Sequence, residues 1–259
     1  MTSTAKSRVI ALGASNLTRL FPVMMRVRSA ALREVAGGCE WLVAAGLGRS
    51  YGVRSRFLGR ELPGIDRCGL WPALEAAPHA HKSATTGIVT DVGNDIFYGV
   101  HVDRILDWVA HCLERLRPLV SRLVVTAIPP SVFELGAFRF WIMRRVIVPS
   151  CKLDLEEGKR RAVALDEGLR SLAERYDAVF YTGERGWYGW DAIHVKRRHW
   201  RTFAEHVLGV AGGGLSGGAL PRWSMRAKCK PELRWMFGRE QRTEQPSLHL
   251  PDGSTASIY

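Results

Sequence analysis

The sequence predicts an α/β protein of three layers, α/β/α, in which a five-stranded parallel sheet lies between two layers of helices. Short apolar runs rich in β-branched residues alternate with longer segments in which apolar residues recur at the helical period. The chain has 259 residues, of which 46% are hydrophobic and 24% charged. This composition is that of a soluble globular protein with a sizeable core, and no apolar run reaches the length that a membrane span needs.

Five runs have the composition of buried strands, because they are apolar, partly β-branched and bounded by turn-forming residues. They cover residues 8–12, 40–45, 85–90, 122–127 and 178–182. Helical periodicity follows over residues 18–36, 102–116, 155–176 and 196–210. Because right-handed crossovers bring the carboxyl ends of such strands to one edge of the sheet, we expect ligands to bind at that edge.

Two segments fall outside this repeat. Residues 131–155 form an aromatic and basic insertion, which suits a lid, a membrane-surface element or an excursion packed on the core. The chain after residue 210 begins with a glycine-rich stretch typical of flexible linkers. We therefore expect one domain over residues 1–211, with a linker and tail over 212–259 that add little to the fold, although Trp223, Trp235 and Phe237 could dock onto it.

The net charge of +12 indicates a basic surface, which attracts nucleic acids, anionic lipids and acidic substrates alike. The sequence has no zinc-finger spacing, no RNP-like strand and no long basic run, so we expect no nucleic-acid partner. Peripheral contact with an anionic membrane stays open. The first apolar run is too short for a signal peptide, which favours the cytoplasm. Five scattered cysteines without a CxxC pair indicate reduced thiols and no metal site; they are Cys39, Cys68, Cys112, Cys151 and Cys229.

Residues suited to acyl-transfer chemistry stand at the ends of the first three predicted strands. Ser15, in the sequence GASN, can act as a nucleophile or cap the helix that follows. Gly46 and Gly48 can bring a backbone N–H close to a ligand, or can serve only the turn. Asn94 can donate to an oxyanion through its neutral side-chain amide, or can form an Asx-turn.

Asp191 and His194 stand three residues apart, between the fifth predicted strand and the last helix. At this spacing the carboxylate can orient the imidazole through Nδ1 while Nε2 faces a serine, as a Ser-His-Asp triad requires. Each signal alone also fits a structural role, such as a helix N-terminal aspartate and a surface histidine. Their shared position at one edge of the sheet favours a catalytic site made of Ser15, His194 and Asp191.

The order of these residues resembles the SGNH, or GDSL-type, hydrolase family over most of residues 8–210. The resemblance implies a flavodoxin-like SGNH hydrolase fold and ester hydrolysis that needs no metal or organic cofactor. It implies that Ser15 is the nucleophile and donates its own backbone N–H to the oxyanion hole, with Gly48 and Asn94 as the other donors. By the same resemblance, Asp191 and His194 in DAIH match the last block of the family.

The sequence departs from the family pattern in two blocks. The first block of the family normally reads Gly-Asp-Ser, and here Ala14 stands in the middle. The third usually has glycine two residues before the asparagine, whereas this chain has Val92 there and Gly93 next to it. Because the triad acid of the family lies in the last block, the catalytic set is intact in the sequence.

The predicted reaction passes an acyl group from a small-molecule, glycan or lipid ester to Ser15 and then to water. Trp187, Tyr188 and Trp190 precede the catalytic pair and form either a substrate-binding wall or part of the core. Three alternatives stay open. They are an O-acyltransferase that uses an alcohol as acceptor, a catalytically inactive binding protein on the same fold, and a module that binds an anion at the helix after Ser15.

Overall fold

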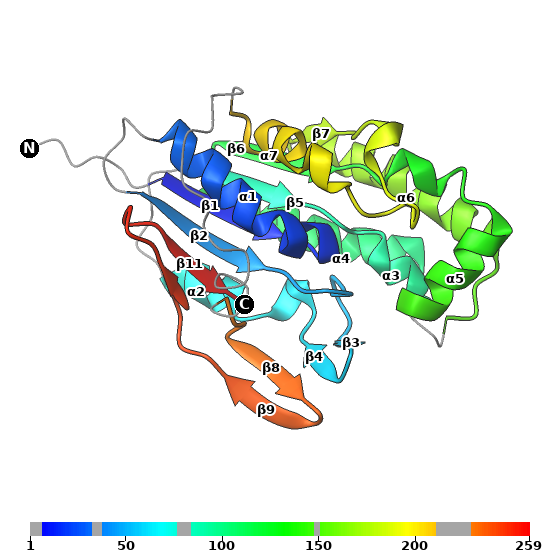
Figure 1. Ribbon diagram of the computed structural model, residues 1–259, viewed down its shortest axis with the longest axis horizontal. Helices are drawn as coiled ribbons and strands as arrows, with labels where there is room; N and C mark the ends of the chain where they lie inside the picture. The colour runs from blue at the N-terminus through cyan, green and yellow to red at the C-terminus, as the bar shows by residue number, and fades with distance from the viewer. Residues whose placement is uncertain (1–6, 33–37, 77–83, 148–150, 211–228) are drawn as a thin grey trace, which may run out of the picture.

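The computed structural model describes residues 7–32, 38–76, 84–147, 151–210 and 229–259. Its centre is a seven-stranded sheet with the strand order β10-β11-β2-β1-β5-β6-β7 (Figure 1). The six strands from β11 to β7 run parallel, and β10 is antiparallel to β11. The predicted α/β/α class is confirmed, although the sheet has two strands more than the five that were predicted.

The five predicted strands are five of the six parallel strands, and each bound lies within one residue of its prediction. They are β1 (Ser7–Leu12), β2 (Cys39–Ala44), β5 (Thr85–Val89), β6 (Arg122–Thr126) and β7 (Val179–Tyr181). Strand β5, in the middle, is buried at every position. Helices cover both faces of such a sheet, and this is why its central strands read as continuous apolar runs.

Two layers of helices enclose the sheet. One layer holds α1 (Ser15–Ala31) and α7 (Trp200–Leu208), and the other holds α2 (Leu70–Ala76), α4 (Val102–Leu116) and α6 (Leu155–Arg175). Single 3₁₀ turns cover Ile65–Arg67, Arg117–Leu119, Pro130–Val132, Arg185–Trp187 and Arg197–His199. Helix α1 begins three residues before its prediction, and the predicted continuation over 33–36 lies outside the described residues.

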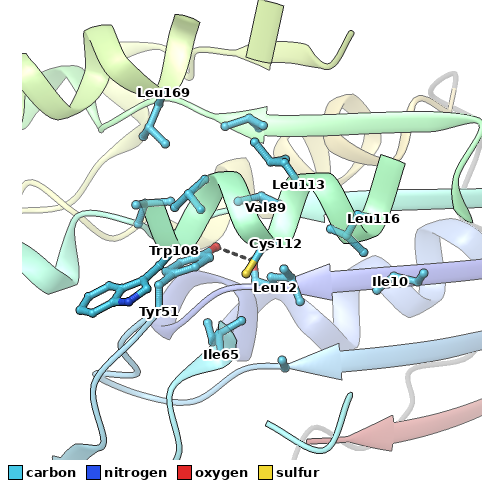
Figure 2. Packing of buried hydrophobic residues seen from close by; sticks show 14 of the residues in the cluster. Ile10, Leu12, Tyr51, Ile65, Val89, Trp108, Cys112, Leu113, Leu116 and Leu169 are labelled. Carbon is cyan, nitrogen blue, oxygen red and sulfur yellow. Dashed lines mark hydrogen bonds between the residues drawn. The ribbon is translucent and has the colours of Figure 1, made fainter. Parts of the chain in front are cut away.

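The core divides into two clusters, because successive strand residues point to opposite faces. Val9 and Ala11 of β1 belong to the cluster under α1 and α7, and Ile10 and Leu12 belong to the cluster under α4 and α6. Figure 2 shows this second cluster, with β1 beside Cys112 and its neighbours on α4. Among the described helices, none combines the length and the apolar character needed to cross a bilayer.

The expectation that the tail adds little to the fold is wrong for residues 229–259. Strand β11 (Thr255–Ile258) pairs along β2, and β10 (Leu248–His249) pairs with β11. Without β11, β2 would be an edge strand with unpaired backbone groups. Ala256 and Ile258 are buried there. The strand was not predicted because its sequence, Thr-Ala-Ser-Ile, contains no apolar run. The predicted linker and Trp223 lie outside the described residues.

A second, antiparallel sheet joins the loop after β2 to the C-terminal region. Its strands are β3 (Ser55–Phe57), β4 (Arg60–Leu62), β8 (Leu233–Met236) and β9 (Arg239–Arg242), in the order β3-β4-β8-β9. Figure 1 shows β8 and β9 extending away from the main sheet. Trp235 and Phe237 thus dock onto the main domain, as expected, but through β4 and the turn before it and not onto the parallel sheet.

The insertion over 131–155 contains the helix α5 (Ala137–Ile147), and its residues 148–150 lie outside the described part of the chain. Leu135 and Phe140 are buried in a small cluster with Ala192, as expected for an excursion packed on the core. Phe138 and Trp141 face solvent, at 70% and 47% exposure. The insertion therefore packs against the loop that carries Asp191 and His194 and also presents aromatic side chains to water.

Candidate active site

Ser15, His194 and Asp191 meet at the carboxyl edge of the parallel sheet, although 179 residues separate the serine from the histidine. The Ser15 Oγ lies 2.8 Å from His194 Nε2, and His194 Nδ1 lies 2.5 Å from Asp191 Oδ2. With the Nδ1–H donated to the carboxylate, Nε2 is the acceptor for the Ser15 hydroxyl proton. This is the hydrogen-bonded chain that the sequence spacing predicted.

The loop of Asp191 and His194 is held in a tight turn. Asp191 Oδ1 accepts the backbone N–H groups of Ile193 and His194, at 3.3 and 3.0 Å. Ala192 between them has φ +63°, and its carbonyl accepts a hydrogen bond from Ser131 of the insertion at 2.6 Å. Desolvation raises the pKa of the Asp191 carboxyl, but the bond and charge of His194 and the two backbone donors outweigh it. The pKa of Asp191 is therefore lowered, which favours the ionised form that orients the imidazole.

Asp91, which sequence reasoning missed, caps the helix that begins at Ser15. Its Oδ2 accepts the backbone N–H groups of Ala14 at 2.9 Å and Leu17 at 3.1 Å. The helix thus receives its cap from the loop after β5, and the Ser15 hydroxyl faces His194. Asp91 has φ +61°, a left-handed conformation that aspartate tolerates better than most residues. In this conformation the Asp91 carboxylate meets the backbone N–H groups of Ala14 and Leu17.

Asn16, also missed, connects the nucleophile turn to both sides of His194. Its Nδ2 donates to the carbonyl of Ile193 and to Asp91 Oδ1, both at 2.8 Å, and its Oδ1 accepts the N–H of Val195 at 3.0 Å. The side chain is buried, with 7% exposed. Because it bonds the residue before His194 and the residue after it, Asn16 fixes the position of the imidazole relative to Ser15.

The three residues predicted as oxyanion donors stand on neighbouring loops. Asn94 begins the short helix α3 (Asn94–Phe97) and is buried, with its Nδ2 at 3.4 Å from the carbonyl of Arg49. Gly48 has φ +67°, and its carbonyl accepts a hydrogen bond from the Tyr98 hydroxyl at 2.6 Å. Asn94 therefore reaches the segment next to Gly48, and the oxyanion role of all three residues stays a prediction.

A buried carboxylate joins the loops of Gly48 and Asn94. Asp95 accepts hydrogen bonds from the Ser50 hydroxyl and from the Tyr51 backbone N–H, the latter at 2.9 Å. Burial raises the pKa of Asp95 to about 7, against the opposing effect of these two donors. The loops that follow β2 and β5 are thus tied through one fully buried acid.

An apolar pocket of about 710 Å³, its open mouth included, begins at Ser15. Its polar lining comes from Ser15, Asn16, Asp91 and Asn94, with Lys159 farther along. The apolar side chains are Ile96, Phe97, Ile128, Pro129, Val132, Leu135, Phe140, Leu153, Leu155, Ala162 and Ile193. Several of these belong to the insertion over 131–155, which therefore forms part of the pocket wall. A mainly apolar lining with a few polar groups at one end is typical of small-molecule sites.

None of the three aromatic residues proposed as a substrate wall is among the residues that line this pocket. Trp187 and Tyr188 are each only 6% exposed and pack in the core under α7, where Trp187 stacks on His199. Trp190 is 56% exposed, and its backbone carbonyl accepts hydrogen bonds from Arg139 of α5. Trp187 and Tyr188 therefore take the second of the two roles expected for them, that of core residues, because the turn before Asp191 directs them inward. A substrate-binding role for Trp190 stays a prediction.

Within the described ranges, no three His, Cys, Asp or Glu side chains lie close enough together to hold a metal ion. The five cysteines are free thiols, and burial raises the pKa of Cys39 and Cys229 to about 11. The hydroxyl of Ser15 is thus the nucleophile best placed beside a base in this site.

Comparison with protein-family models and with curated protein sequences gives no match for this chain. Among solved structures it is similar to TesA, with 15% identity and a TM-score of 0.49 over 78% of this chain and 97% of TesA. It is similar to Axe2, an acetylxylan esterase from Geobacillus stearothermophilus, with 12% identity and a TM-score of 0.48 over 80% and 97% of the two chains. A member of the lipolytic G-D-S-L family from Veillonella parvula has 12% identity and a TM-score of 0.46 over 79% and 97%. Likeness at this level does not define an activity, so function is argued from the site itself.

Proposed function

We propose that the protein is a serine hydrolase that cleaves carboxylic esters through an acyl-enzyme. The observation that carries this proposal is the continuous hydrogen-bonded chain from Ser15 Oγ through the His194 imidazole to Asp191. A serine is a weak nucleophile at neutral pH unless an adjacent base removes its proton. In this site the base is in hydrogen-bond contact with the hydroxyl, and its other nitrogen is held by a carboxylate.

In the first step, Ser15 Oγ attacks the ester carbonyl carbon while its proton passes to His194 Nε2. The resulting imidazolium is stabilised by ionised Asp191. When the tetrahedral intermediate collapses, the bond to the alcohol oxygen breaks and His194 gives its proton to that oxygen. Water then enters, loses a proton to His194, and releases the acyl group from Ser15 as a carboxylic acid by the same route.

The negative charge on the carbonyl oxygen needs hydrogen-bond donors that are already in place. We assign this role to the backbone N–H groups of Ser15 and Gly48 and to the side-chain amide of Asn94. Support comes from the hydrogen bonds of Asp95 to Ser50 and Tyr51, since these connect the loops of Gly48 and Asn94. Removal of a single donor from such a site costs about a hundredfold to a thousandfold in rate.

The pocket supports an ester with an apolar group as the substrate. It begins at Ser15 and continues between α3, α6 and the insertion, where nearly all of its lining is aliphatic or aromatic. Each methylene group that such a pocket buries adds about 0.8 kcal/mol of binding, or about fourfold. We therefore expect kcat/KM to rise from acetyl esters to esters of longer straight chains.

A fluorophosphonate probe tests the chemistry directly. We expect one covalent label, mapped to Ser15 by peptide mass spectrometry, in the wild-type protein and none in Ser15→Ala. The variant His194→Ala should be labelled at least a hundredfold more slowly, because the hydroxyl has lost its base. A wild-type protein that is folded and unlabelled would overturn the proposal and favour a binding protein.

A series of p-nitrophenyl esters from acetate to decanoate tests the substrate class. In Ala162→Leu a larger side chain enters the pocket, so the preference for long chains should fall while acetate hydrolysis is kept. An equal loss with every ester would contradict the assignment of this pocket. Analysis of products with and without added alcohols separates hydrolysis from transfer to an alcohol acceptor, since both pass through the same acyl-enzyme.

A further inference from the structure

Two hairpin turns of the second sheet carry nearly the same sequence and the same backbone. Residues 57–60 read Phe-Leu-Gly-Arg, and residues 236–239 read Met-Phe-Gly-Arg. In the first turn Leu58 has φ +48° and Gly59 has φ +76°. In the second, Phe237 has φ +50° and Gly238 has φ +80°. Both turns are therefore of the kind in which the two central residues are left-handed.

Neither local structure nor the core accounts for Leu58 and Phe237. A left-handed first position favours asparagine, aspartate or glycine, and a bulky apolar residue there is strained. The two residues are 84% and 83% exposed, which makes them the most exposed large apolar side chains among the described residues. The turns thus hold apolar side chains in water at positions where polar residues would be more stable.

The two apolar tips lie side by side. Strands β4 and β8 pair with each other, and the backbone N–H of Phe237 donates to the carbonyl of Gly59 at 2.8 Å. The Phe237 ring covers Gly59 so closely that a Cβ at position 59 would lie 2.4 Å from it. Residues 54–62 and 233–242, here called the double hairpin, therefore present one apolar tip made by two distant segments of the chain. Figure 1 shows the strands of the double hairpin, β3, β4, β8 and β9, below the main sheet.

Basic side chains outnumber acidic ones along the double hairpin. The double hairpin contains six arginines and two glutamates, a surplus of four positive charges. Arg56 is 76% exposed beside Glu61, and Arg242 is 65% exposed beside Glu240. Arg54 stacks on the Trp235 ring at 3.7 Å. Exposed apolar tips with arginines and an interfacial tryptophan have the composition of segments that bind the surface of anionic membranes.

We propose that the double hairpin docks this protein on an anionic lipid bilayer, with Leu58 and Phe237 inserted among the lipids and the arginines at the headgroups. Insertion at an interface needs no complementary pocket, so it suits two side chains that project from turns. The surplus of positive charge selects an anionic surface, and the net charge of +12 acts in the same direction.

The double hairpin is attached to the candidate active site. Arg60 donates to the carbonyl of Leu47 at 3.2 Å, and the Phe57 ring lies 3.4 Å from the Cβ position of Gly48. A bilayer bound at the tip would therefore lie on the side of the Gly48 loop. The docking itself does not depend on Ser15 or His194, so it holds or fails apart from the proposed esterase activity.

Flotation with vesicles of phosphatidylcholine, with and without 30% phosphatidylglycerol, at several salt concentrations tests the proposal in the full-length protein. We expect wild-type protein and Ser15→Ala to float equally with the anionic vesicles and to be released by high salt. The double variant Leu58→Asn, Phe237→Asn should bind at least tenfold more weakly. Because Asn-Gly is favoured in these turns, its melting temperature should be unchanged or higher.

Phe138→Gln is the matched control, since Phe138 is 70% exposed on a different surface, that of α5. Its binding should equal that of the wild type. Binding that is lost in Phe138→Gln and kept in the double variant would overturn the proposal, because the membrane would then contact the insertion. Absence of wild-type binding to anionic vesicles, or equal binding to neutral ones, would also overturn it.

Discussion

Asp91 and Asp95 both follow β5, four residues apart, with Asp91 in the loop and Asp95 in the short helix α3. Each accepts hydrogen bonds from a neighbouring loop. Asp91 holds the turn after β1, where it accepts the N–H groups of Ala14 and Leu17. Asp95 holds the loop after β2 through the N–H of Tyr51 and the hydroxyl of Ser50. Asp91 is partly exposed at the pocket, whereas Asp95 is fully buried and its pKa is raised to about 7.

The two aspartates therefore differ in role, because Asp91 positions residues of the candidate site whereas Asp95 affects the stability of the fold. Asp91 acts on residues that touch the nucleophile and, through Asn16, on the loop of His194. Asp95 acts farther from Ser15, and its burial makes the ionised form costly in the folded state. We therefore expect changes at Asp91 to appear mainly in catalysis and changes at Asp95 to appear mainly in the pH dependence of stability.

Asp91→Ala should have the largest effect. Two main-chain donors and the Asn16 amide lose an acceptor, and the nucleophile turn loosens. We expect kcat to fall about a hundredfold or more, with KM changed much less, and the free energy of unfolding to fall by about 1–2 kcal/mol. Asp91→Asn keeps the left-handed backbone and part of the bonding, so it should recover some of the rate. Steady-state ester hydrolysis measures kcat and KM, and chemical denaturation measures the free energy of unfolding. An unchanged kcat in Asp91→Ala would contradict the positioning role of Asp91.

Asn16→Ala should have the next largest effect. It leaves the Val195 N–H and the Ile193 carbonyl without this partner and frees the His194 loop. We expect kcat and the rate of fluorophosphonate labelling to fall together, by about tenfold to a hundredfold. Thr18→Val is the control, because it removes a hydrogen bond of the same turn, from Thr18 Oγ1 to Ala14 O at 2.6 Å, without touching His194. Equal losses of rate in the two variants would show that the role of Asn16 is only structural.

Asp95→Asn should change the pH dependence of stability. The pKa of Asp95 is raised from 3.8 to about 7, first of all by burial, so between these values the folded protein holds a proton that the unfolded chain has lost. The free energy of unfolding of the wild type should therefore fall as pH rises through this window, by about 1.4 kcal/mol per pH unit at most. Asp95→Asn should lack this slope while kcat stays within tenfold. Urea denaturation from pH 4 to pH 8 measures this slope. The same pH dependence of stability in the wild type and in Asp95→Asn would contradict the raised pKa of Asp95.

Gly48→Ala should have the smallest effect. A Cβ there would meet Phe57 at 3.4 Å and the Tyr98 hydroxyl at 3.6 Å, which are ordinary contacts. The cost is that of a side chain at φ +67°, about 1 kcal/mol, and the backbone N–H is kept. We expect thermal unfolding a few degrees lower and a loss of rate below tenfold. A loss above a hundredfold with normal stability would mean that the loop after β2 positions the reaction as strictly as the turn after β1.

The sequence was sufficient to predict five of the six parallel strands and the meeting of Ser15, His194 and Asp191 for identifiable reasons. Strands β1 and β5 are apolar throughout because both faces are buried, and this pattern is local. Ser15, Asp191 and His194 were found because the chemistry of a triad restricts both the residue types and the places where they stand.

Other features depend on contacts that no local pattern records. Asp91 and Asn16 read as ordinary turn and cap residues, and only their bonds across 75 residues or more give them a role. Trp187 and Tyr188 could not be assigned to the core or to a wall, since a single turn decides which way they point.

The pairing of β11 with β2 also bears on how the molecule is made. These partners stand about 215 residues apart, so β2 has one side open while the rest of the sheet is synthesised and leaves the ribosome. During that interval an unpaired, apolar strand is exposed to other nascent chains, which is the condition under which newly made proteins aggregate or recruit chaperones.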